Sequence, residues 1–104
     1  MKPSRIDALK KMAEARPDDA RARFGLALEY ERAEQWDEVV RELRTYLSLT
    51  TDEGNAYGRL GHALHQLGRD DEAKAAYRDG IAAAARHNHP TMVEEFEEIL
   101  NFEF

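Results

Sequence analysis

Apolar residues recur at every third or fourth position through most of this chain, in six segments separated by short polar breaks. This spacing is typical of amphipathic α-helices, each with one apolar face. The pattern therefore predicts an all-α fold, with helices over about 3–16, 20–33, 36–49, 54–67, 70–87 and 90–101.

Residues at the breaks indicate where the helices begin and end. Ser4 is followed three residues later by Asp7, the spacing of a capping box at a helix N-terminus. Gly68 is placed to end the fourth helix, because glycine tolerates the left-handed backbone conformation that is common there. Thr91 and Glu94 also have capping-box spacing, and they predict the start of the sixth helix.

The central helices repeat with a period of 34 residues. Shifted by that number, Leu26 falls on Leu60, Asp37-Glu38 on Asp71-Glu72, and Arg44 on Arg78. Residues 20–53 and 54–87 are thus two copies of one helix–turn–helix unit. A unit this short cannot bury its own apolar face, so the copies are expected to stack. The same register makes 3–16 the second half of a further unit, because Leu9 falls on Leu43, and it leaves 90–101 as a capping helix.

These residues resemble the tetratricopeptide repeat family, whose unit has 34 residues with small side chains where its helices cross. The first copy is more degenerate, since Arg23, Ala27 and Glu34 stand where the second copy has Tyr57, Gly61 and Gly68. The resemblance implies one domain, 1–104, built as a right-handed antiparallel solenoid of helical hairpins. The second copy carries the match through Tyr57, Leu60-Gly61, Leu64, Gly68, Ala73, Tyr77 and Ile81.

The resemblance also implies a partner-binding groove, because in this family the first helix of each unit lines the concave face. The expected groove is basic on an otherwise acidic chain, which favours a protein or peptide that is acidic or has a free C-terminus. The alternative is that Phe24 and Leu28 belong to the core and are covered by a neighbouring helix. The groove residues are Arg21, Phe24, Leu28, Arg32, Asn55, Arg59, His62, His65, Gln66 and Phe96.

Composition narrows the function further. Fifteen Lys and Arg against 21 Asp and Glu give a net charge of −6, which argues against nucleic-acid or anionic-membrane surfaces. The chain has no Cys, no apolar run near the ~18 residues of a membrane span, and no signal-like N-terminus. The expected location is cytoplasmic.

Catalytic and metal chemistry find little support in the sequence. His62 and His65 stand three residues apart, a spacing that also occurs in zinc sites, but polar groove residues explain them as well. Nucleophile triads and glycine-rich phosphate loops are absent. We therefore expect no catalysis, no metal and no cofactor.

The sequence favours a protein-interaction module, and it leaves two alternatives open. One is a self-assembling protein, a homodimer for example, whose groove or C-terminal end is filled by another copy. The other is an accessory or regulator of an enzyme. Phe102 and Phe104 lie at the end of the chain, where we expect them to fold back onto the last helices or to dock into another copy.

Overall fold

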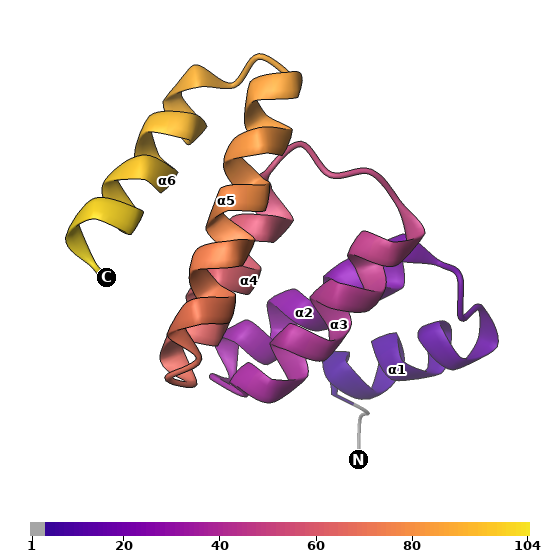
Figure 1. Cartoon of the computed structure of the whole chain (residues 1–104). Coiled ribbons are helices and arrows are strands. Elements are labelled where there is room, and N and C mark those ends of the chain that lie inside the picture. The colour runs from indigo at the N-terminus through magenta and orange to yellow at the C-terminus, as the bar shows by residue number, and fades with distance from the viewer. Residues whose placement is uncertain (1–3) are drawn as a thin grey trace. The chain divides into compact units, whose positions relative to one another are not determined.

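The computed structural model describes residues 4–104, which form six α-helices and no strand. The chain divides into two compact units, with the boundary between Thr50 and Thr51. Each unit packs consecutive antiparallel helices, which confirms the predicted all-helical hairpin architecture (Figure 1). The first unit holds α1 (Arg5–Ala15), α2 (Ala20–Arg32) and α3 (Trp36–Leu49), and the second holds α4 (Asn55–Gln66), α5 (Asp70–Arg86) and α6 (Pro90–Phe102).

Side-chain caps fix the starts of three helices, and the first of them is the cap that the sequence analysis predicts. The Ser4 hydroxyl accepts a hydrogen bond from the Asp7 amide at 3.1 Å. Asp19 accepts from two amides in the first turn of α2, and Asp52 accepts from the amides of Gly54 and Ala56 at the start of α4. Each cap satisfies amide groups that have no partner inside the helix.

The sixth helix starts at residue 90, as predicted, but its cap differs from the prediction. The helix begins at Pro90, with His89 as the N-cap and no hydrogen bond from a capping side chain, so the Thr91–Glu94 capping box was wrong. Proline suits the first helical position because its fixed φ is helical and the amide it lacks would have no partner there. Thr91 consequently lies inside the first turn.

Three helices end at a residue with left-handed backbone. Gly68 has φ +74° after α4, as predicted, while Glu34 has φ +55° after α2 and Asn88 has φ +57° after α5. Glutamate adopts this conformation only at a cost, since its Cβ crowds the backbone. Glu34 is therefore a strained position in the first unit.

The core of the first unit lies mainly between α2 and α3, where Leu26, Val39 and Leu43 are almost fully buried. The first helix adds Ala13 to this core. Its Leu9 lies against Gly25 of α2, where an added Cβ would come 3.1 Å from a Leu9 methyl group.

Two aromatic rings resting on three glycines form the centre of the second unit. Tyr77 of α5 and Phe96 of α6 pack with ring centroids 5.6 Å apart. A Cβ at Gly61 would lie 2.7 Å from the Tyr77 ring, and a Cβ at Gly58 or Gly80 would lie 2.6 or 2.8 Å from the Phe96 ring. Gly61 is thus at a helix crossing, as the sequence predicts, and the missing side chains make the space that the rings fill.

Candidate partner-binding faces of α2 and α4

Four of the predicted groove residues share one stripe of α4. Asn55, Arg59, His62 and Gln66 follow the i, i+4, i+7, i+11 spacing that places side chains on one side of a helix. All four are exposed or partly exposed, and Asn55 accepts a hydrogen bond from Arg59 Nε at 2.9 Å. The α4 face therefore presents a cation and several hydrogen-bonding groups without any carboxylate of its own.

His65 lies off this stripe and is occupied within the second unit. Its Nδ1 is 3.0 Å from an Asp70 carboxylate oxygen, and its ring lies edge-on to Phe104 at 4.7 Å. The ring centroid of Phe104 also lies 6.2 Å from that of Tyr77, and the Lys74 ammonium lies 5.9 Å from the Phe104 ring centroid. The end of the chain thus folds back onto α4 and α5 and covers part of His65.

The remaining aromatic residues of α6 separate into a buried and an exposed one. Phe96, expected in the groove, is only 8% exposed and contributes to the core rather than to an open face. Phe102 is 84% exposed, in contrast to the half-buried Phe104.

The α2 face of the first unit is more apolar than the α4 face. Phe24 and Leu28 are half-buried, and the Phe24 ring packs on Tyr46 of α3 at 5.0 Å. Arg21 and Arg32 are exposed at the two ends of this stripe, where Arg32 pairs with Glu29 at 3.1 Å. The face therefore offers a partly covered apolar centre between two guanidinium groups.

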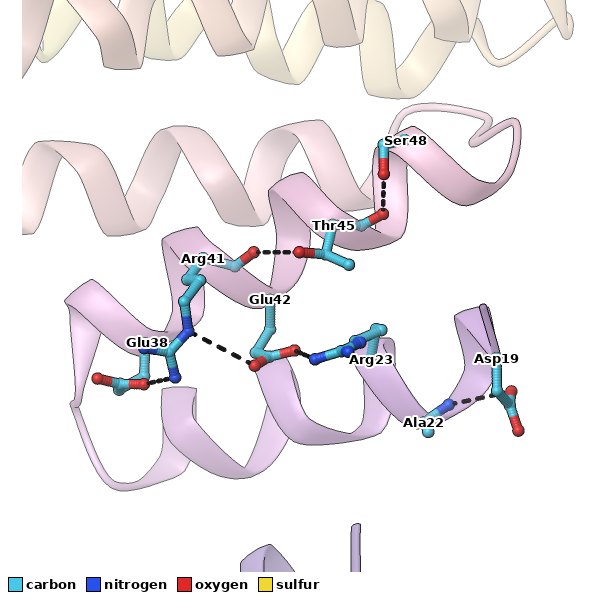
Figure 2. Close-up of polar contacts among 8 residues, drawn as sticks. All are labelled: Asp19, Ala22, Arg23, Glu38, Arg41, Glu42, Thr45 and Ser48. Carbon is cyan, nitrogen blue, oxygen red and sulfur yellow. Dashed lines mark hydrogen bonds and ion pairs between the residues drawn. The ribbon is translucent and has the colours of Figure 1, made fainter. Parts of the chain in front are cut away.

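Sequence reasoning missed a buried ion pair behind the α2 face (Figure 2). Glu42 of α3 is 4% exposed, and Arg23 Nη1 donates to it at 3.1 Å. Arg41 lies beside the same carboxylate at 3.7 Å and also pairs with Glu38. The sequence feature that could have revealed this pair is Arg23 itself. It stands where the second unit has Tyr57, and a cation at a packing position needs a partner of opposite charge.

The two histidines near the end of α5 also meet a carboxylate. His89 Nε2 lies 2.8 Å from Glu53 Oε1, and His87 Nδ1 lies 3.8 Å from the same oxygen. The His89 hydrogen bond is the main reason that the pKa of Glu53 is lowered. In the described part of the chain, no three His, Asp or Glu side chains form a group that could hold a metal ion.

Comparison with known families gives a match over most of the chain. A family model for the tetratricopeptide repeat covers residues 2–84, about four fifths of the chain. The chain belongs to the tetratricopeptide repeat family. A search of curated proteins returned no match.

Tetratricopeptide repeats generally act as protein-interaction modules, so membership in the family gives the exposed faces of the helices a functional meaning. The matched region spans α1 to most of α5 and ends before α6. Within residues 4–104, none of the helices has the length and apolar character needed to cross a membrane.

Proposed function

We propose that this protein binds a protein or peptide partner through the exposed face of α4, with the α2 face as a further contact surface. The observation that supports this most directly is the α4 stripe of Asn55, Arg59, His62 and Gln66, which carries donors and no carboxylate on a chain of net charge −6. The role is that of a non-catalytic adaptor or scaffold, and a cytoplasmic location is part of the same proposal.

The chemistry of the α4 face favours an acidic partner. A guanidinium group binds carboxylates through charge-assisted hydrogen bonds, and amide side chains such as Asn55 and Gln66 pair with a peptide backbone. The α2 face repeats the preference, because Arg21 and Arg32 flank the apolar side chains of Phe24 and Leu28. An acidic peptide, or one with a terminal carboxylate, fits the α4 face, and a peptide that adds an apolar anchor fits the α2 face.

A displayed library of random peptides would test this proposal. The selected peptides should be enriched in Asp and Glu, and their binding is measured by fluorescence anisotropy. Arg59→Glu with Gln66→Glu should weaken binding by about 10- to 100-fold, since a hydrogen bond to a charged group contributes about 1.5–3 kcal/mol.

Arg78→Glu with Ala82→Glu on α5 is the matched control, because it makes the same total charge change at exposed positions of the same unit. It should bind as the wild type does, and circular dichroism should show that all variants keep their helix content. Selected peptides that bind the Arg59 and Arg78 variants equally well, or a library that yields no binder, would contradict the proposal.

A further inference from the structure

The ring of Phe104 sits among three side chains that come from two other helices of the second unit. Its centroid lies 4.7 Å from that of His65 on α4 and 6.2 Å from that of Tyr77 on α5. Both rings meet it at steep angles, 64° and 61°. The Lys74 ammonium of α5 lies 5.9 Å from the same centroid. We call His65, Lys74 and Tyr77 the aromatic cradle.

The geometry of the aromatic cradle suits an aromatic ring better than an aliphatic side chain. An aromatic ring is electron-rich on its faces and electron-poor at its edge, so steep ring–ring angles are favourable. The same charge distribution attracts an ammonium group that lies within about 6 Å of the ring centroid. An aliphatic side chain would fill the space but would gain neither interaction. The cradle therefore selects a Phe or Tyr side chain.

The aromatic cradle is held in place by contacts of its own within the second unit. Tyr77 is 4% exposed, and its ring packs on Phe96 and fills the space over Gly61. His65 Nδ1 lies 3.0 Å from a carboxylate oxygen of Asp70, which fixes the orientation of the imidazole ring. None of these contacts involves the ring that the cradle holds. The cradle therefore stays preorganised when that ring leaves, and preorganisation lowers the cost of binding another.

Phe104 is held in the aromatic cradle mainly by its side chain. Helix α6 ends at Phe102, and the Glu103 amide donates the last hydrogen bond to the Ile99 carbonyl oxygen at 2.9 Å. The backbone of Phe104 makes no hydrogen bond with residues 4–103, and its side chain is only half-buried. The two residues before it are exposed. A segment with so few contacts opens at a lower free energy than the core does.

We propose that the aromatic cradle binds a Phe or Tyr side chain of a partner peptide, and that Phe104 occupies this site until the partner displaces it. A tethered side chain competes at an effective concentration on the order of millimolar, so only a partner that binds the cradle with additional contacts displaces it at lower concentration. This site goes beyond the proposed function, because it uses none of the four residues of the α4 stripe.

A titration followed by two-dimensional NMR tests the proposal on the full chain. Phe104→Ser empties the aromatic cradle without altering any of its three residues. The probe is the peptide acetyl-Asn-Ser-Glu-Phe-amide, which repeats residues 101–104 with Ser in place of Phe102. Amide signals of His65, Lys74 and Tyr77 should shift and saturate. The dissociation constant should be about 10-fold lower for Phe104→Ser than for the wild type, the ratio expected when Phe104 fills the cradle in about nine molecules of ten.

Phe102→Ser is the matched control, because it removes a phenylalanine of the same segment that is 84% exposed. It should bind the probe as the wild type does. A second probe with cyclohexylalanine in place of phenylalanine has a similar shape without the aromatic ring, and it should bind Phe104→Ser several-fold more weakly. Adding Lys74→Ala to Phe104→Ser should weaken binding of the first probe by about 2- to 5-fold, through loss of the cation–π contact.

Circular dichroism checks that the variants keep their helix content. Phe104→Leu, which keeps an apolar side chain, serves as a second variant and should also bind the probe more tightly than the wild type. Two results would overturn the proposal. One is that neither Phe104 variant binds the probe more tightly than the wild type, up to about 20 mM peptide. The other is equal binding of the phenylalanine and cyclohexylalanine probes, because it would show that the cradle does not recognise an aromatic ring.

Discussion

The buried pair of Arg23 and Glu42 permits a sharp test of how the first unit is held together. Replacing Arg23 by Met keeps an unbranched chain of similar reach and removes its charge. Glu42, at 4% exposure, then loses its 3.1 Å donor and keeps only Arg41 at 3.7 Å. The reverse change, Glu42→Met, removes the carboxylate and leaves Arg23, whose side chain is 23% exposed.

The expected magnitudes differ between the two single variants. Removing one partner of a buried pair typically costs about 3–5 kcal/mol, because a buried charge is left uncompensated. We expect about 2–3 kcal/mol for Arg23→Met, since Arg41 still faces Glu42 and both line a hollow of about 260 Å³. For Glu42→Met we expect about 1 kcal/mol, because the more exposed Arg23 side chain can turn toward water.

The double variant should recover most of this loss. Arg23 Nε is buried without a hydrogen-bond partner in the described structure, so the native pair is itself incompletely compensated. Replacing both charges by Met should give a stability within about 1 kcal/mol of the wild type. The coupling between the two positions is then about 2–5 kcal/mol in favour of the pair.

Urea denaturation followed by circular dichroism measures the free energies of unfolding of all four proteins. The variants should share one m-value, so that differences in midpoint report stability. Additive effects of the two single substitutions would refute the reasoning, because they would show that the two charges do not interact. An Arg23→Met variant as stable as the wild type would show that Glu42 is not buried in solution.

Three further predictions concern the helix crossing, the strained C-cap and the buried tyrosine. Gly61→Leu should lower the free energy of unfolding by up to about 3 kcal/mol in urea denaturation, because even a Cβ there lies 2.7 Å from the Tyr77 ring; an unchanged midpoint would place Gly61 away from a crossing. Glu34→Gly should raise the thermal midpoint through a gain of about 0.5–1 kcal/mol, since glycine adopts φ +55° without strain, and a lower midpoint would show that the left-handed conformation is not populated. Burial, and secondarily the charge of Glu103, raise the pKa of Tyr77 to about 12. The unfolded chain loses the phenol proton near pH 10 while the folded protein keeps it, so between pH 10 and 12 the free energy of unfolding of the wild type should fall by up to roughly 2–3 kcal/mol more than that of Tyr77→Phe. Equal falls in the two proteins would contradict the burial of Tyr77.

The sequence was sufficient to predict the helices, because their apolar spacing and most of their caps are local features. The cap of α6 was mispredicted for a local reason as well. Thr91 and Glu94 have the spacing of a capping box, but Pro90 lies one residue earlier and is itself well suited to the first turn.

The candidate site could be predicted only in part, because a stripe on a helix is local and its covering is not. Periodicity gave the α4 stripe, and the structure places Asn55, Arg59, His62 and Gln66 on one side of that helix. Periodicity could not reveal that Phe96 is buried against Gly58 and Gly80, since this burial depends on how α6 packs across two other helices. The sequence analysis expected Phe104 to fold back or to dock into another copy, but its contact with His65 could not be predicted, because it joins residues 39 positions apart.

The two units pack their helix crossings with different residues, and this difference explains why the first unit resembles the family pattern less well. In the second unit, Gly61 makes room for the Tyr77 ring. The positions 34 residues earlier hold Ala27 and Leu43, both buried. Ala27 is larger than Gly61 and Leu43 is smaller than Tyr77, so the change on one helix is balanced by the change on the other. The first unit departs further, because Arg23 replaces an aromatic residue and is compensated by Glu42 on the facing helix. A substitution that looks degenerate against the repeat pattern is therefore one half of an exchange, and its other half lies on the partner helix of the same hairpin.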